Sequence, residues 1–181
     1  MAPAIQVAKN YMIATVFVDT NIFVYARDLA FPRKQSVARG WLERLWRDRT
    51  GRVSVQVLSE YYTTMTRKLR PQLLPEDAWE DVRALAAWRP QPVDLPVLER
   101  GREIERRFSL SWWDSLIVAA AQMQDCTLLL SEDLQDAMTI GNVTIRNPFA
   151  RQATEPIEPY AAASASAERH PARGRPRKRA R

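Results

Sequence analysis

Short apolar runs alternate with longer segments of helical periodicity along most of this 181-residue chain, and this alternation limits the possible folds more than any other feature. The runs are about four residues long, and apolar side chains recur every three or four positions in the segments between them. Strands that alternate with helices in this way form a parallel sheet with helices on both faces. We therefore predict an α/β protein with three layers (α/β/α) and a short-stranded, mainly parallel sheet.

The pattern places the elements as follows. Strands are expected at Val16–Asp19, Arg52–Val55, Pro92–Leu95, Thr127–Leu130 and Val143–Arg146. Helices are expected at Thr20–Arg27, Lys34–Arg47, Val57–Leu69, Pro75–Trp88, Val97–Arg107 and Trp112–Gln124. The last of these helices is apolar nearly all round, which is typical of a buried helix.

Composition divides the chain into three parts. Residues 13–150 have the length and pattern of one domain with a sizeable core. Met12 opens a second plausible start of translation, so residues 1–12 are expected to be an N-terminal extension. After Ala150 the composition shifts to Ala, Ser, Pro and Arg, and residues 151–181 are expected to be disordered.

The excess of positive over negative charge is confined to the last part. Residues 168–181 contain seven Lys or Arg and one Glu, which accounts for the whole net charge of +6. The stretch RGRPRKR is similar to an AT-hook, a Gly-Arg-Pro core flanked by basic residues that can lie in the minor groove of A·T-rich DNA. Its residues are Arg173, Gly174, Arg175, Pro176, Arg177, Lys178 and Arg179. Non-specific attraction to polyanions and the absence of any role stay open as alternatives.

Several classes of protein are excluded or disfavoured. No apolar run approaches the roughly 18 residues of a membrane span, and no secretory signal is recognisable. The only cysteine, Cys126, cannot form an intramolecular disulfide and is expected in the core, so we expect a cytoplasmic protein. The only histidine, His170, lies in the tail, which excludes a pair of catalytic histidines. No glycine-rich phosphate loop is present.

Four acidic residues lie next to apolar segments or within them, where a charged side chain is unexpected. Asp19 and Asp133 follow apolar strands, at the edge where open α/β sheets bind ligands. A helix N-cap or a turn would also explain either residue. Asp114 is the only charged residue between Phe108 and Gln124, and burying it unpaired would cost several kcal/mol. The alternative is an acid in the first turn whose hydrogen bonds are satisfied.

Glu60 lies about 60° beyond the edge of the apolar arc of its helix, where a side chain can point into a cleft or into solvent. Clustered carboxylates raise one another's pKa values unless a cation offsets their charge. Oxygen ligands suit the hard ions Mg²⁺ and Mn²⁺.

These motifs resemble a known family. VFVDTNIFVYA, the SEYY helix, WWDSLIVAAA and LLLSEDLQD followed by VTIRNPF are similar, in order and spacing, to the PIN-domain ribonucleases, and closest to VapC-type toxins of toxin–antitoxin pairs. The resemblance covers residues 13–149 and implies a PIN-like fold. It also implies a metal site of Asp19, Glu60, Asp114 and Asp133, with Thr20, Asn21 and Ser131 as polar companions. Asp136 is a nearby acid that the resemblance leaves as a spectator.

The resemblance implies a metal-dependent endoribonuclease that uses Mg²⁺ or Mn²⁺, forms a homodimer and binds a small antitoxin. In this reading Asp19 is the central ligand, Asp114 and Asp133 complete the site, and Glu60 binds directly or through water. Two alternatives stay open: a housekeeping or DNA-directed PIN nuclease, and a DNA-binding regulator that acts through its tail.

The tryptophans divide into two groups. Trp41 and Trp46 fall on the apolar stripe of a helix and are expected in the core. Trp112 and Trp113 precede Asp114. For these two, core packing is favoured over a place in a substrate groove, where bases could stack.

Overall fold

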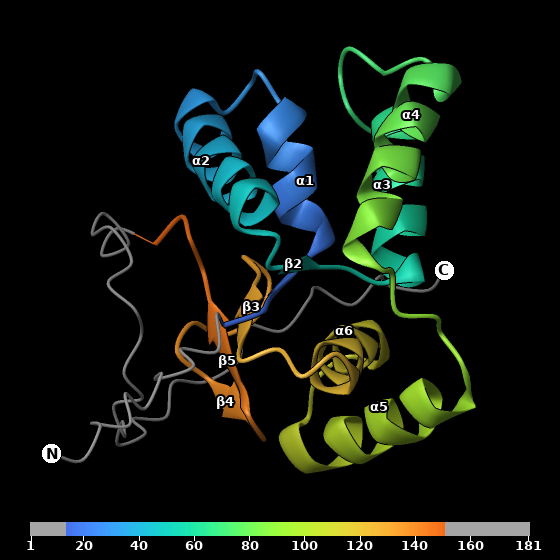
Figure 1. Ribbon diagram of the computed structural model, residues 1–181, viewed down its shortest axis with the longest axis vertical. Coiled ribbons are helices and arrows are strands. Elements are labelled where there is room, and N and C mark those ends of the chain that lie inside the picture. The colour runs from blue at the N-terminus through green and yellow to red at the C-terminus, as the bar shows by residue number, and fades with distance from the viewer. Residues whose placement is uncertain (1–13, 151–181) are drawn as a thin grey trace, which may run out of the picture.

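A computed structural model describes residues 14–150 (Figure 1). The expected N-terminal extension and the basic tail lie outside the described residues.

A five-stranded sheet forms the centre of the fold. Its strands are β1 (Val16–Val18), β2 (Gly51–Arg52), β3 (Leu128–Leu130), β4 (Thr139–Ile140) and β5 (Val143–Arg146). They lie in the order β2-β1-β3-β5-β4, and only the pairing of β4 with β5 is antiparallel. β1 and β3 are buried on both faces, as their continuous apolar runs require.

Six α-helices flank the sheet within residues 14–150. They are α1 (Thr20–Arg27), α2 (Pro32–Asp48), α3 (Val55–Arg67), α4 (Pro75–Leu85), α5 (Leu95–Phe108) and α6 (Trp112–Met123), and a 3₁₀ turn, η1 (Ala86–Trp88), extends α4. Consecutive helices pack in pairs, α1 with α2, α3 with α4, and α5 with α6 (Figure 1). This is the three-layer, mainly parallel α/β/α arrangement that the sequence predicts, and the prediction of fold class is confirmed.

Polar caps and prolines set the helix starts. Asp19, Ser54, Asp94 and Ser111 each accept a hydrogen bond from the backbone of the helix that follows. α2 and α4 instead begin with a proline, whose missing N–H has no partner to lose at that position. Because Ser54 caps α3, that helix starts two residues earlier than its apolar periodicity suggests.

Two expectations from the sequence were wrong, and one strand was missed. Pro92–Leu95 is not a strand: Gln91 makes a single bridge to Ser54, and Asp94 already caps α5. The two-residue strand β4 was missed, because it is too short to show alternation. Trp46 lies on the expected stripe of α2 but is 40% exposed, so it is not a core residue.

The buried elements match expectation. Residues 115–121 of α6 are all buried, and so is Cys126. None of the helices between residues 14 and 150 combines the length and the apolar character needed to cross a membrane.

Candidate active site

The candidate site lies at the carboxyl ends of β1 and β3. The chain goes from β1 to β2 on one side and later enters β3 on the other side, so a crevice opens where the strand order reverses. Asp19 follows β1 directly, and Ser131 follows β3 directly. The Ser131 hydroxyl donates a hydrogen bond of 2.7 Å to Asp19 Oδ2. Two residues that are 112 positions apart are thereby joined by the sheet register.

Asp19 is both a helix cap and a buried acid. Its side chain accepts from the Thr20 N–H at 2.7 Å, from Asn21 Nδ2 at 3.0 Å and from the Ser131 hydroxyl. Burial raises the pKa of Asp19 to about 6, and the neighbouring charges of Asp133 and Glu60 add to the rise. The hydrogen bonds from Ser131 and Thr20 oppose it. The fold thus keeps a carboxylate where its ionised form is unfavourable unless positive charge is near.

Asn21 links Asp19 to a second acid. Its Nδ2 donates to Asp19 Oδ2 at 3.0 Å and to Asp133 Oδ2 at 3.3 Å, so one amide nitrogen lies between two carboxylates. Its Oδ1 accepts from the Glu132 N–H at 3.4 Å, which ties the loop after β3 to α1. Asn21 is neutral, and it stabilises the two close carboxylates by donating a hydrogen bond to each.

Glu60 reaches the same place from α3. Thr20 Oγ1 donates to its Oε2 at 3.1 Å, and Gln56 Nε2 donates to its Oε1 at 3.0 Å. Gln56 Nε2 also donates to the backbone carbonyl of Trp113 at 3.3 Å, so it connects α3 to the start of α6. Gln56 was not predicted from the sequence. Its position four residues before Glu60 on one helix face was the available signal.

For Asp114 the sequence left open a residue of the candidate site or an acid in the first turn of a helix, and the structure is compatible with both. Its backbone N–H donates to the Ser111 hydroxyl, and that hydroxyl donates to Asp114 Oδ2 at 2.6 Å. It is therefore a first-turn acid with a satisfied hydrogen bond and a favourable helix dipole. It also lines the same hollow as Asp19, Glu60 and Asp133.

That hollow has a volume of about 370 Å³, and we call it the acidic hollow. Besides the four acids, its lining includes Thr20, Asn21, Tyr25, Asp28, Phe31, Gln56, Trp113 and Glu132. Ser131 lies beneath it, fully buried behind Asp19. Asp136 is not part of the lining and instead accepts a hydrogen bond from the Asn147 N–H at 2.8 Å.

Glu132 is a further acid of the hollow that the sequence analysis did not single out. The Lys34 ammonium forms an ion pair with it and donates to the Tyr25 hydroxyl at 2.9 Å. The same ammonium lies 4.2 Å from the centre of the Tyr25 ring. Lys34 therefore offsets the charge of Glu132 and joins α2 to the loop after β3.

The chemistry of the lining suits a hard divalent cation, because its acids and its amide and hydroxyl groups all offer oxygen ligands. Among residues 14–150, however, no three His, Cys, Asp or Glu side chains are gathered closely enough to hold a metal ion. Each of the four carboxylates accepts a hydrogen bond from a neighbouring side chain instead. Binding a cation would require some of these carboxylates to move closer together, and their remaining lone pairs allow them to keep their present donors.

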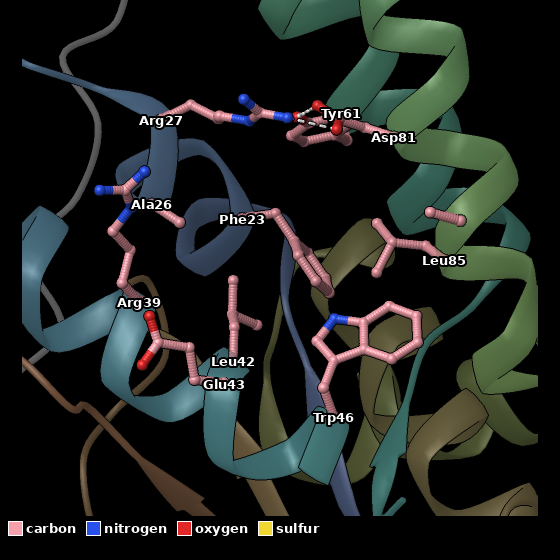
Figure 2. A pocket seen from close by; sticks show the side chains of 11 residues that line it. Phe23, Ala26, Arg27, Arg39, Leu42, Glu43, Trp46, Tyr61, Asp81 and Leu85 are labelled. Atoms are coloured by element: carbon pink, nitrogen blue, oxygen red, sulfur yellow. Dashed lines mark hydrogen bonds and ion pairs between the residues drawn. The ribbon is translucent and has the colours of Figure 1, made fainter.

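A second hollow of about 480 Å³ lies between the α1–α2 pair and the α3–α4 pair. Figure 2 shows Phe23 of α1, Leu42 and Trp46 of α2, and Leu85 of α4 around it. At one end Arg27 forms an ion pair with Asp81, which also accepts a hydrogen bond of 2.6 Å from the Tyr61 hydroxyl (Figure 2). None of the four candidate acids lines this hollow, which we call the helix-pair hollow.

Comparisons with known proteins agree with the architecture. Solved structures with a similar fold include a toxin–antitoxin complex from Klebsiella pneumoniae, with 17% identity, a TM-score of 0.53, and coverage of 72% of this chain and 96% of that one. VapBC2 from Rickettsia felis, bound to a promoter DNA fragment, has 18% identity, a TM-score of 0.53, and coverage of 74% and 98%. The Sarcin-Ricin loop cleaving toxin VapC20 from Mycobacterium tuberculosis has 22% identity, a TM-score of 0.50, and coverage of 64% and 87%.

At these identities the likeness establishes the fold alone. The comparison with curated proteins found no match. The family model of the PIN domain matches residues 16–135, which is most of the described chain and includes all four candidate acids. The chain therefore belongs to the PIN domain family.

Proposed function

We propose that this protein is a metal-dependent endoribonuclease, the toxin of a toxin–antitoxin pair, which hydrolyses RNA phosphodiester bonds at the acidic hollow. One observation carries the proposal: four carboxylates from four separate segments of the chain line a single hollow at the carboxyl edge of the sheet. A structural scaffold has no need of such an arrangement, because each acid raises the cost of ionising the next.

Asp19, Asp114 and Asp133 would hold the cation, Mg²⁺ or Mn²⁺, and Glu60 would complete the site directly or through water. A cation bound there supplies positive charge that polarises the scissile phosphate and lowers the pKa of a water molecule. Ser131, Asn21 and Thr20 orient Asp19 and Glu60 by hydrogen bonds, and Gln56 fixes the other oxygen of Glu60. Asp19 would be the central ligand, because burial raises its pKa and a bound cation would favour its ionised form.

The toxin assignment is supported by the solved relatives. One is described as a toxin that cleaves the Sarcin-Ricin loop, and two are toxin–antitoxin assemblies. By analogy we propose a cognate antitoxin and a homodimer for this chain. As the family resemblance implies, a segment of the antitoxin would occupy the acidic hollow, where it would keep RNA from the four acids.

Expression in bacteria, followed by assay of the purified protein, tests the proposal. Expression alone should slow growth, and Asp114→Asn should relieve the effect because it removes one ligand charge while keeping the side-chain shape. The purified protein should cut RNA with Mg²⁺ or Mn²⁺ and stop when EDTA is added. A co-expressed antitoxin should copurify and block cutting.

Harmless expression of a folded protein that still cuts RNA would refute the toxin role and favour a housekeeping nuclease. Cutting that survives EDTA, or that Asp114→Asn leaves at the wild-type rate, would refute the metal site.

A further inference from the structure

Two exposed aromatic rings line the acidic hollow without a role in the acid chemistry. Trp113, in the first turn of α6, is 62% exposed, and Phe31, just before α2, is 50% exposed. They come from different elements and both belong to the lining of the acidic hollow. The neighbouring Trp112, by contrast, packs against the core. Sequence reasoning favoured core packing for both tryptophans, and for Trp113 that expectation was wrong.

The backbone beneath each ring is held in place. The carbonyl of Trp113 accepts a hydrogen bond from Gln56, which also holds Glu60, and the next residue is Asp114. The Phe31 ring packs edge-to-face on Tyr25 at 5.8 Å between centroids, and Tyr25 is itself held by Lys34. Exposing large apolar rings to water is unfavourable, yet the fold places both residues in the lining of the acidic hollow.

The charge of the hollow limits what can hold a nucleic acid there. Among the described residues that line it, six are carboxylates and none is Lys or Arg; the carboxylates are Asp19, Asp28, Glu60, Asp114, Glu132 and Asp133. Phosphate groups are repelled by such a surface until a cation is bound. Stacking on an aromatic ring carries no such penalty, because every nucleobase has a neutral π face.

From this arrangement we propose that Trp113 and Phe31 are stacking platforms that bind unpaired nucleobases of RNA next to the candidate cleavage site. The inference rests on the proposed nuclease function, and it adds the requirement that the bound RNA has unpaired bases. A base within a duplex has both faces covered by its neighbours, so only a single-stranded or looped segment can be bound in this way.

Binding of short labelled RNA to the full-length protein in EDTA tests the inference, since stacking needs no cation and no cutting occurs to confuse the reading. Each single-stranded probe is compared with an abasic probe of equal length and charge, so that purely electrostatic binding cancels from the ratio of affinities. The wild type should bind the probe with bases about 5 to 100 times more tightly than the abasic probe. A duplex of the same sequence should show no such gain.

Trp113→Ala and Phe31→Ala should each lower the ratio, and Trp113→Phe should keep most of it, because a ring is retained. Trp79→Ala is the matched control: Trp79 is 55% exposed on α4 but does not line the acidic hollow, so the ratio should stay at the wild-type value.

A wild-type ratio near one, or an unchanged ratio in both alanine variants, would overturn the inference. A shift of Trp113→Ala in size-exclusion chromatography with an unchanged ratio would also overturn it and would make Trp113 a subunit contact. Failure of the nuclease proposal would give a different result: the protein would bind probes with bases more tightly than abasic probes but would cut no RNA with any metal ion.

Discussion

At the scale of single residues, Asp19 shows how one side chain meets a structural and a chemical demand together. It caps α1 through the Thr20 N–H, and its second oxygen meets Ser131 and Asn21 at the neighbouring strand end. The sequence presented the cap and the metal ligand as alternatives, but the cap uses Oδ1 and leaves Oδ2 for contacts at the site, so the cap does not exclude the proposed ligand role. Its ordinary turn chemistry therefore gave no reason to discount Asp19 as a functional residue.

The place of a residue at the site was harder to predict where it depends on the direction of its side chain. Glu60 was placed correctly at the edge of the buried face of its helix, because helical periodicity fixes that angle. Gln56, Lys34 and Trp113 were not predicted at the site. Their contacts depend on how α3, α2 and α6 meet in space, which a pattern along one helix does not contain.

The raised pKa of Asp19 predicts a linked dependence on pH and metal. Its folded-state pKa of about 6 is above the ordinary value of 3.8, so its contribution to stability is greatest below pH 3.8 and is lost as pH rises through 6. The loss amounts to about 3 kcal/mol. A divalent cation favours the ionised form, so Mn²⁺ should raise the melting temperature clearly at pH 7.5 and much less at pH 5.

Differential scanning fluorimetry at the two pH values measures this. Asp19→Asn has no carboxyl group to titrate at this position and serves as the control, with little Mn²⁺ shift at either pH. Equal Mn²⁺ shifts for wild type at pH 5 and pH 7.5 would contradict the assignment of Asp19 as the central ligand.

At the scale of elements, periodicity located every helix and most strands. β1, β3 and β5 are continuous apolar or alternating runs, and they were predicted within a residue at each end. The failure at Pro92–Leu95 has a physical reason. The chain there could either extend the single bridge between Gln91 and Ser54 into a strand or begin α5. Asp94 caps α5, so the helix begins at Leu95 and no strand forms.

The close packing of α5 on α6 gives a prediction about Gly101. A Cβ at Gly101 would come within 2.7 Å of the Leu116 side chain, whereas a Cβ at Gly40 of α2 would meet nothing within 4 Å. Gly101→Val should therefore destabilise the protein by about 1–3 kcal/mol through overpacking. Gly40→Val is the matched control and should change stability by much less. Urea unfolding monitored by circular dichroism measures both, and equal costs for the two variants would contradict the packing explanation.

At the scale of the whole molecule, the candidate site exists only in the folded chain. Asp19, Glu60, Asp114 and Asp133 come from four segments that the sheet order and the helix pairs bring to one edge. The order of short strands and helices was enough to predict the three layers of the fold and the edge of the sheet at which the candidate site lies. The spacing of the carboxylates within the hollow was not predictable, because it depends on the hydrogen bonds that they accept from Asn21, Thr20, Gln56 and Ser111.

The basic tail, outside the described residues, adds a prediction about nucleic-acid binding. Residues 168–181 carry the whole net charge, so truncation after Ala167 should weaken duplex DNA binding and flatten its salt dependence while leaving cleavage of a short RNA nearly unchanged. Full-length and truncated protein would be titrated with A·T-rich and G·C-rich duplexes at two salt concentrations. An AT-hook requires tighter binding to the A·T-rich duplex. Equal affinity for both sequences leaves only electrostatics, and equal affinity of both proteins removes the tail as a binding element.

The central claim is that the four carboxylates hold a divalent cation that acts on an RNA phosphate. The most direct test is single-turnover cleavage of an RNA with one non-bridging oxygen of the scissile phosphate replaced by sulfur. Mg²⁺ is a hard ion that binds sulfur poorly, whereas Mn²⁺ accepts softer ligands. We predict that the sulfur substitution slows cleavage strongly in Mg²⁺, that Mn²⁺ restores much of the rate, and that Asp19→Asn abolishes cleavage in both. Equal cleavage of the oxygen and sulfur substrates in Mg²⁺, or undiminished cleavage by Asp19→Asn, would contradict the account.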